Sequence, residues 1–409
     1  MKNIWIINHY AMPPEFETRV RNNVMAKHLQ KSGYEVKIFA ASTLHNTDIN
    51  LMRGSRSLFV EKNYDGLSFV HIRTSDYTGN GFSRIVNMLQ FPLRFVRVAR
   101  RIDPKPDVII CDLEAIFAPI PYLVSRRLGS KFILEVRDLW PESIVEYKGI
   151  SRRNVLIQLL YKIEKWIYEK ADEVVFSMEG GMDYIRDKGW CRGIDEGKIH
   201  YINNGVDLQS FNDNKENCIT EDVDLLNTET FKVVYAGSLR KANNVKKILD
   251  VALAIHQKGL DTVEFFIYGE GPDRQHLEQF CLDNNLTNVK FKGLVDKRQV
   301  PYILTKCDLN IMHFEQNSLK KYGASLNKMF EYFASGRPTL SDCEFGYDLI
   351  KKYKCGIVID DATPAQLADA IAEFCNMSTE EYEIYCQNAL MAASDYDLQY
   401  LSKQLERIL

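Results

Sequence analysis

Short apolar segments alternate with amphipathic stretches along most of the chain, and this alternation limits the possible folds more than any other feature. Near the start, the runs NIWIINHY and EVKIFAAS are separated by RVRNNVMAKHLQKSG, whose apolar residues recur with helical periodicity. Continuous apolar runs are typical of strands that are buried on both faces of a parallel sheet. The pattern therefore predicts βαβ units, and with them an α/β fold built on parallel sheets.

The alternation occurs in two series, which are separated by a polar, acidic stretch at 212–230. The expected strands are LSFVHIRT, DVIICD, KFILEVRD and EVVFSM in the first series and FKVVYAGS, VEFFIYG, NVKFKG, LNIMHF, RPTLS and CGIVI in the second. We expect two tandem doubly wound, Rossmann-like domains at 1–210 and 211–392, and a C-terminal helix at 393–409 that packs back on the N-terminal domain. Since such sheets bind ligands beyond the carboxyl ends of their strands, the two domains would form one interdomain cleft.

Composition excludes several classes of protein. The 409 residues are 45% hydrophobic and 26% charged, and no apolar stretch is long enough to predict a transmembrane helix or a signal peptide. The nine cysteines are scattered and never in CxxC spacing, so we expect neither a disulfide framework nor a zinc site, and a cytoplasmic location. Residues 1–212 carry 30 Lys and Arg against 25 Asp and Glu, which leaves an acidic second half with 22 against 30. The pI of about 6.3 and the lack of an RNA-binding signature disfavour nucleic acid as a partner.

The strongest local signal is the segment YGASLNKMFEYFASGRPTLSD at 322–342. We expect Ser325 to cap a helix that follows the small residues Gly323 and Ala324. A loop of small residues at a helix N-terminus presents backbone N–H groups to an anion, which predicts a diphosphate site. Lys328 and Glu331 share a helix face and could bind a phosphate and two vicinal sugar hydroxyls. A solvated surface pair is the alternative for these two side chains.

Six segments together resemble the family 4 glycosyltransferases of the GT-B class, and the resemblance covers nearly the whole chain. The pattern N-K-x-F-E-Y-x-A-x-G-x-P is similar to the donor-site helix of that family, and EVRDLWPES at 135–143 is similar to its bacterial surface-polysaccharide branch, which includes amino-sugar transferases. The remaining segments, in the expected order, are I-x-H-Y-x-x-P-P-E at the start, INNGVD-x-x-x-F at 202–211, YAGSL and YGEGP at 268–272.

The resemblance implies a set of donor-binding residues. Glu331 matches the second Glu of the E-x7-E motif, which binds the donor ribose, whereas the first Glu is replaced by Gly323, so we expect backbone amides from Gly323 to Leu326 to substitute. The usual basic residues after the first strand of the second domain would fall at Ser238 and Asn243, neither of which is basic. We expect Arg240 and Lys241, in the same loop, to bind the diphosphate instead. The expected donor-binding residues are Gly237, Ser238, Arg240, Lys241, Gly269, Gly323, Ala324, Ser325, Leu326, Asn327, Lys328 and Glu331.

Catalytic residues are expected at the end of the strand KFILEV. Many relatives place a His there, whereas this chain has Arg137 followed by Asp138, a plausible acid/base and positioning pair. A structural ion pair is the alternative. Lys241, beside the departing diphosphate, completes the expected catalytic set. Asp222-Val-Asp224 fits the metal-binding D-x-D pattern but lies in a polar loop, so we expect surface residues and a reaction that needs neither a metal nor a cofactor.

The first strand and the loop after it supply the expected acceptor side. Arg19 in this loop and Arg21 beside it could hold an acceptor pyrophosphate. Either arginine could equally be a solvated helix residue. The expected acceptor-side residues are His9, Tyr10, Glu15 and Arg19.

Two stretches suggest contact with a membrane surface. Residues 82–102 mix large apolar side chains with five arginines and no acid, and residues 152–170 are amphipathic with basic flanks and Trp166. Such faces are typical of interfacial helices, although ordinary packing against the sheet is the alternative for both. Pro92 is expected to divide the first stretch into two helices.

Together with the resemblance, these features predict a metal-independent glycosyltransferase, peripheral at the cytoplasmic face of the cell membrane. The resemblance implies retention of configuration and a UDP-linked donor. The enzyme would move a sugar from a nucleotide-sugar donor, UDP-linked and possibly an N-acetylated amino sugar, to a lipid-linked or saccharide acceptor in surface-polysaccharide synthesis, such as O-antigen or capsule. GDP-mannose is the alternative donor. The alternative functions are a nucleotide-sugar epimerase or hydrolase on the same fold, and a non-catalytic protein that docks sugar nucleotides or membrane.

Overall fold

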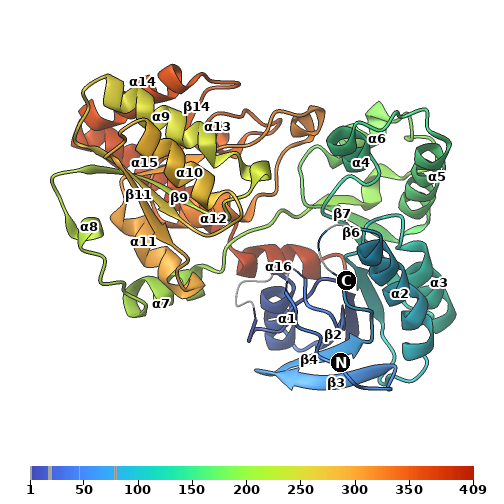
Figure 1. Cartoon of the computed structure of the whole chain (residues 1–409). Helices are drawn as coiled ribbons and strands as arrows, with labels where there is room; N and C mark the ends of the chain where they lie inside the picture. The colour runs from blue at the N-terminus through green and yellow to red at the C-terminus, as the bar shows by residue number, and fades with distance from the viewer. Residues whose placement is uncertain (1, 17–20, 46, 78, 80) are drawn as a thin grey trace. The chain divides into compact units, whose positions relative to one another are not determined.

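The computed structural model describes residues 2–16, 21–45, 47–77, 79 and 81–409, and the chain divides into two compact units (Figure 1). Unit 1 extends to Asn203 and also contains Leu398–Leu409, whereas unit 2 comprises Asn204–Asp397. The division thus falls a few residues before the expected boundary at 210 and a few after the expected boundary at 392. The last residues of the chain belong to unit 1.

Unit 1 is built on an eight-stranded sheet with the order β3-β4-β2-β1-β5-β6-β7-β8. All expected strands of the first series are confirmed, and two short strands at the sheet edges were not predicted. One of these, β3, pairs antiparallel with β4, and the other pairs described in this sheet are parallel. The strands are β1 (Asn3–Ile7), β2 (Glu35–Ala41), β3 (Phe59–Tyr64), β4 (Leu67–Ile72), β5 (Val108–Cys111), β6 (Lys131–Val136), β7 (Glu173–Phe176) and β8 (Ile199–Tyr201).

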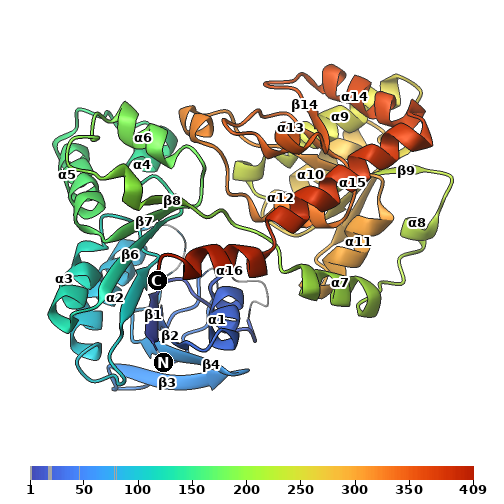
Figure 2. The ribbon, with the colours of Figure 1, turned by 180° about the vertical axis from the view of Figure 1, so that it is seen from behind.

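The C-terminal helix closes one side of this sheet. Leu398, Leu401 and Leu405 of α16 (Leu398–Glu406) are buried in one apolar core with α1 (Arg21–Lys31) and the central strands, and Figure 2 shows α16 beside α1. Among the described residues, no helix combines the length and apolar character that crossing a membrane requires. The other helices of unit 1 are α2 (Phe82–Val98), α3 (Pro119–Leu128), α4 (Glu142–Lys148), α5 (Val155–Lys170) and α6 (Gly181–Asp187).

The expectation that Pro92 divides residues 82–102 into two helices is wrong, because α2 continues through it. Proline in a helix interior removes one backbone hydrogen bond and usually kinks the helix. In α2, Pro92 is buried between Phe91 and Phe95, which are fully buried. Burial of this apolar face offsets the lost hydrogen bond, so packing overrides the local preference.

Unit 2 contains a six-stranded sheet with the order β11-β10-β9-β12-β13-β14, and all its described pairs are parallel. All expected strands of the second series are confirmed. They are β9 (Phe231–Ala236), β10 (Val263–Tyr268), β11 (Val289–Gly293), β12 (Leu309–Met312), β13 (Thr339–Ser341) and β14 (Gly356–Val358). The helices are α7 (Leu208–Asn217), α8 (Val223–Leu226), α9 (Val245–Gln257), α10 (Arg274–Asp283), α11 (Val300–Lys306), α12 (Asn327–Ala334), α13 (Leu349–Tyr353), α14 (Pro364–Asn376) and α15 (Thr379–Asp395).

The strand orders place one topological switch point in each sheet. In unit 1 the order reverses between β1 and β5, and in unit 2 it reverses between β9 and β12. Connections leave in opposite directions at such a point, so a crevice opens beyond the carboxyl ends of the two strands and becomes the usual ligand site. The side chains that follow β1, β5, β9 and β12 are therefore the first candidates for function.

Candidate active site

In unit 2, the loop before α12 differs in one respect from the prediction. Ser325 does not cap the helix, because the N-cap is Leu326, whose side chain cannot accept a hydrogen bond. The Ser325 hydroxyl is buried and has no hydrogen-bond partner among the described residues. Gly323 has φ 97°, a backbone conformation that favours glycine. The start of α12 therefore has no side-chain cap, and its first N–H groups are available to an anion.

Lys328 lies in the first turn of α12 and points toward the end of β9. Its ammonium lies 4.6 Å from the centre of the Tyr235 ring and 3.5 Å from the Tyr235 hydroxyl. No carboxylate forms an ion pair with Lys328 among the residues that the structure describes, and burial lowers its pKa to about 8. An ammonium without a counter-ion in such a place is costly, so this position is suited to an added anion. Glu331 is half-buried one turn further along the same helix.

The loop after β9 is held in shape by its own side chains. Asn243 donates hydrogen bonds to the Ser238 carbonyl at 2.7 Å and to its hydroxyl at 2.8 Å, so Asn243 braces the loop from within. Arg240 and Lys241, expected to serve the diphosphate, are exposed. Their side chains extend into solvent from the rim of the loop.

Gly269 follows β10, and its backbone approaches the loop after β9 closely. Its φ is 136°, and a Cβ at this position would lie 1.8 Å from the Gly237 carbonyl oxygen. No side chain fits there, so the closeness of two loops already explains the glycine. Asn327, also expected at the donor site, accepts a hydrogen bond from Asn204 at 3.0 Å.

In unit 1, a network of polar side chains fills the switch point between β1 and β5. Asp112, directly after β5, accepts hydrogen bonds from Asn8 at 2.6 Å and from Asn22 at 3.2 Å. Arg137, directly after β6, forms an ion pair with Asp112 at 3.3 Å. Asp138 lies beside this pair with its side chain exposed. Desolvation by the surrounding protein raises the pKa of Asp138, and the charge of Arg137 opposes that shift. The described ion pair of Arg137 is thus with Asp112, a partner that the sequence did not indicate.

Of the two arginines expected to hold an acceptor pyrophosphate, only Arg21 is among the described residues. Arg19 lies outside the described residues. Arg21 is buried, pairs with Glu135 at 2.8 Å and donates to the carbonyls of Ile202 and Asn203. Arg21 therefore joins three segments of unit 1, and the expectation that it binds an acceptor is wrong because its guanidinium is occupied within the fold.

The other acceptor-side residues lie at different depths. His9 is buried, its Nε2 lies 2.6 Å from the Asn87 side-chain oxygen, and burial lowers its pKa to about 4. Tyr10 is partly exposed, and its hydroxyl accepts hydrogen bonds from Arg84 at 3.0 and 3.1 Å. Glu15 is exposed. Tyr10 is thus the expected residue best placed to contact a ligand at this edge.

Glu114 was not predicted as a site residue, although it lies only two residues beyond Asp112. Burial raises the pKa of Glu114 to about 7, and the negative charges of Asp112 and Asp138 act in the same direction. A hydrogen bond from the backbone N–H of Glu114 itself opposes this shift, whereas Asp112 forms an ion pair with Arg137. A signal was present in the sequence, since a carboxylate shortly after a strand at the switch point is a site candidate.

The D-x-D pattern is structural in this chain. Asp222 and Asp224 form ion pairs with Lys292, and Asp224 also pairs with Lys290 at 2.8 Å. In the described part of the chain, no group of His, Cys, Asp and Glu side chains is arranged to hold a metal ion.

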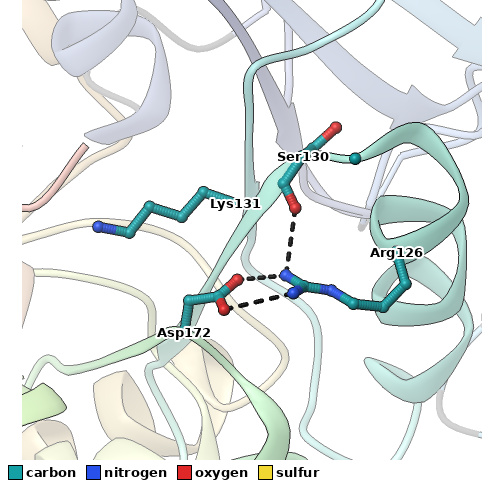
Figure 3. A pocket seen from close by; sticks show the side chains of 5 residues that line it. Arg126, Ser130, Lys131 and Asp172 are labelled. Carbon is teal, nitrogen blue, oxygen red and sulfur yellow. Dashed lines mark hydrogen bonds and ion pairs between the residues drawn. The ribbon is translucent and has the colours of Figure 1, made fainter.

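A hollow of about 330 Å³ lies at the opposite edge of the first sheet, where β6 begins (Figure 3). Arg126 donates there to the Ser130 carbonyl at 3.1 Å and forms an ion pair with Asp172. Its cation is thus neutralised within the fold, and the hollow lies at the amino end of the strand, away from the switch point. We assign it no role in the reaction.

Two family models match the chain in sequence. Residues 20–210 match the model described as Glycosyltransferase Family 4, and residues 230–377 match the model described as Glycosyl transferases group 1. The two matches cover most of both units. The chain belongs to the family 4 glycosyltransferases, and its two parallel-sheet units have the GT-B fold.

Among curated relatives, the chain is 27% identical over 239 residues to the putative teichuronic acid biosynthesis glycosyltransferase TuaH of Bacillus subtilis, which spans 56% of this chain and 55% of that protein. It is 21% identical to the probable glycosyltransferase WbjE of Pseudomonas aeruginosa, over 73% of this chain and 72% of that one. The chain thus matches little more than half the length of the first relative. A solved structure from E. coli, described as trehalose-6-phosphate bound with UDP-2-fluoro glucose, superposes with a TM-score of 0.74 at 10% identity, over 99% of this chain and 98% of that one.

We expect Glu114 to contribute a pH step to the transfer rate. The carboxylate can accept a hydrogen bond or a proton from a hydroxyl, whereas the neutral acid is a poorer acceptor, so the rate should rise with pH through about 7. Glu114→Gln should remove this step, and Glu35→Gln, an exposed residue at the amino end of β2, should keep it. Rates measured from pH 5.5 to 8.5 check this, and an unchanged step in Glu114→Gln would contradict it.

Proposed function

We propose that this glycosyltransferase moves a sugar from a UDP-linked donor to a lipid-linked saccharide, with retention of configuration, in the synthesis of a bacterial surface polysaccharide such as an O-antigen or capsule. Unit 2 binds the donor and unit 1 binds the acceptor. The proposed transferred sugar is an N-acetylated amino sugar, and the proposed location is the cytoplasmic face of the cell membrane. The reaction proceeds without a metal ion or a cofactor.

The single observation that carries the donor site is the unpaired ammonium of Lys328 at the end of β9. It lies beside Gly237, at a switch point, on a helix whose first turn has no side-chain cap. Three features that attract anions thus coincide at a place where the fold forms a crevice. The Ser325 hydroxyl adds an unused hydrogen-bond donor. We propose that the two phosphates of the donor bind here.

Residues next to Lys328 are proposed to bind the ribose and the departing diphosphate. Glu331 accepts hydrogen bonds from the ribose hydroxyls, and the backbone from Gly323 to Leu326 takes the place of the missing first Glu of the family motif. Arg240 and Lys241 approach the phosphates from the rim of the loop. Cations and N–H groups at this position stabilise the negative charge that develops on the leaving diphosphate.

During transfer, the bond between the sugar C1 and the phosphate oxygen breaks, and UDP leaves with the electron pair. The acceptor hydroxyl oxygen forms the new bond to C1 on the same face, and its proton passes to a base. Asp138 and Glu114 are the proposed candidates on the acceptor side, with Arg137 fixed in position by Asp112. Tyr10 and Arg84 border the acceptor sugar, with His9 behind them and Glu15 in the loop after β1.

The names of similar proteins support the choice of substrates. The solved E. coli structure contains a UDP-sugar analogue, and TuaH is assigned to teichuronic acid, a cell-surface polymer. These likenesses favour UDP over GDP as the nucleotide and a polysaccharide intermediate as the acceptor.

One face of α2 supports contact with a lipid surface. Phe91 and Phe95 pack into the core, whereas Phe82, Ile85, Leu89 and Leu93 are exposed, Phe82 by 79%. These four positions recur at helical spacing and form one apolar stripe on the outer side of the helix. The exposed residues Arg97, Arg100 and Arg101 follow it. An apolar stripe beside several arginines fits the interface of an anionic membrane.

A parallel feature occurs at the start of α5, where Val155, Leu156 and Leu159 are exposed. Trp166, in contrast, packs edge-on against Tyr122 and is partly buried. Only the first turns of α5 are therefore proposed to meet lipid.

We expect Lys328→Met to weaken UDP binding by roughly 30-fold, about 2 kcal/mol, because it removes a charge-assisted hydrogen bond. Since burial lowers the pKa of this lysine to about 8, UDP affinity of the wild type should also fall as pH rises above 8, and the variant should lack that fall. Isothermal titration calorimetry between pH 7 and 9 measures both effects. Glu331→Ala, which removes the proposed acceptor for the ribose hydroxyls, should abolish detectable UDP binding.

Lys352→Met provides the matched control, because Lys352 is an exposed ammonium that lies over the ring of Tyr353. It should bind UDP as the wild type does. Normal UDP affinity in Lys328→Met would contradict the donor site. UDP-sugar turnover that never needs an acceptor would favour an epimerase or hydrolase, and binding without turnover would favour a docking protein.

We expect transfer to proceed at its full rate in excess chelator, since Lys328, the rim cations and the α12 N–H groups are proposed to stabilise the leaving diphosphate. The measurement is the rate of UDP release with a lipid pyrophosphate-linked sugar, in EDTA and after addition of Mg²⁺ or Mn²⁺. Strict dependence on an added divalent metal would refute this part of the proposal.

We expect Leu89→Ser/Leu93→Ser to lose most of the binding to vesicles that contain phosphatidylglycerol. Both side chains are exposed, so the fold and UDP binding should persist. Co-sedimentation with anionic and with purely phosphatidylcholine vesicles measures the effect. Leu282→Ser/Ile384→Ser removes equally exposed side chains of unit 2 and should bind as the wild type does; equal vesicle binding by both double variants would exclude the α2 stripe.

A further inference from the structure

A buried cluster of three charged or titratable side chains lies at the carboxyl edge of unit 2 and was not predicted from the sequence. His313 directly follows β12, Asp342 directly follows β13, and Lys247 lies in the first turn of α9. None of them belongs to the donor-binding set proposed above. The cluster therefore requires an explanation of its own.

The Asp342 carboxylate holds the cluster together. It lies 2.6 Å from the Lys247 ammonium and 2.5 Å from Nδ1 of His313, and it accepts a hydrogen bond from the Phe314 backbone N–H at 3.3 Å. Although burial alone would raise its pKa, the hydrogen bond from His313 and the contact with Lys247 lower the pKa of Asp342 below its ordinary value. The carboxylate is therefore ionised and fixed from three sides.

An ionised carboxylate at Nδ1 determines which imidazole nitrogen carries the proton. Nδ1 must donate to Asp342, so in the neutral ring Nε2 presents its lone pair as an acceptor. His313 is 7% exposed, and its Nε2 is buried with no hydrogen-bond partner among the described residues. Buried nitrogens are normally paired, so an oriented imidazole with one unused acceptor indicates a missing hydrogen-bond donor.

The strand register places this acceptor beside the proposed phosphate site. β12 pairs with β9 so that Leu309 lies opposite Val233 and Asn310 opposite Val234. Beyond this pairing the Tyr332 hydroxyl lies between the two strands, where it accepts from the Ala236 N–H at 3.3 Å, and His313 and Gly237 are the first residues after β12 and β9. Lys328 approaches Gly237 from α12. His313 therefore flanks the switch point at which the donor is proposed to bind.

A hydrogen-bond acceptor such as Nε2 of His313 can pair only with a part of the nucleotide sugar that carries a hydrogen-bond donor. The phosphates of UDP carry no hydrogen-bond donors at neutral pH, whereas the transferred sugar carries several hydroxyls. We propose that Nε2 of His313 accepts a hydrogen bond from a hydroxyl of the transferred sugar, and that Asp342 and Lys247 are positioning residues that hold the imidazole for this contact. This inference rests on the proposed function and assigns a sugar-reading residue within it.

The test compares two ligands and two substitutions of His313. His313→Asn keeps an amide N–H near the position of Nδ1, and thus the bond to Asp342, but removes the Nε2 atom. His313→Gln places an amide near Nε2 and lacks the group at Nδ1. UDP, UDP-glucose and UDP-N-acetylglucosamine are titrated calorimetrically into each variant, and His256→Asn, an exposed histidine of α9, is the control.

A second measurement addresses the positioning residues. In the wild type, the ¹⁵N spectrum of the His313 imidazole should show the tautomer with the proton on Nδ1. Asp342→Asn should shift the population toward the Nε2–H tautomer and lower sugar-dependent binding along with it. An unchanged tautomer in this variant would overturn the positioning role. A contact that only stabilised the fold would leave the tautomer as it is.

We expect His313→Asn to bind UDP as the wild type does and to bind the better of the two UDP-sugars about tenfold more weakly, while its melting temperature changes little and His313→Gln recovers part of the loss. Equal loss for UDP and UDP-sugar, or no loss for either, would overturn the assignment of the sugar hydroxyl. If the wild type itself fails to bind UDP, the proposed donor site fails first, which is a distinguishable result.

Discussion

The parallel pairing of β9 with β12 is the constraint on which the candidate donor site depends. The two strands end at the same edge, and the connections that follow them diverge, so backbone alone cannot fill the space beyond them. The loop after β10 then closes against this edge so tightly that Gly269 has no room for a side chain. The ammonium of Lys328 lies beside Gly237 at this edge, and His313 directly follows β12.

The polar edges of the two units differ in how far their charges are satisfied. In unit 1, Arg21 pairs with Glu135 and Arg137 pairs with Asp112, so both arginines are neutralised within the fold. In unit 2, Lys328 carries a charge that no described acidic side chain balances. A satisfied edge provides a rigid frame for a neutral partner such as a sugar hydroxyl, whereas an unsatisfied cation is stabilised when an anion arrives.

The sequence was sufficient for the fold, because parallel strands buried on both faces leave long apolar runs that few other structures produce. It missed β3 and β8, which are edge strands with fewer apolar residues. The helix start at 322–342 was recognisable from its small residues, but its exact cap was not, since the cap is set by the extended backbone at Leu326 rather than by any pattern of sequence.

The interactions that the sequence could not reveal join residues distant along the chain. The contact between Arg21 and Glu135 spans 114 positions, and that between His313 and Asp342 spans 29. A local pattern describes Arg21 as a cation in a helix and cannot show that it is buried. Glu114 was overlooked for the same reason, because its pKa depends on burial and on charges at the ends of other strands.

The location of α16 affects the order in which the chain can fold. Three leucines of this helix complete the core of unit 1, yet they are synthesised only after the whole of unit 2. All of unit 2 has been synthesised by then and contains its own core. Unit 2 can therefore fold while α16 is still missing, whereas the sheet of unit 1 keeps one side uncovered until α16 has been synthesised.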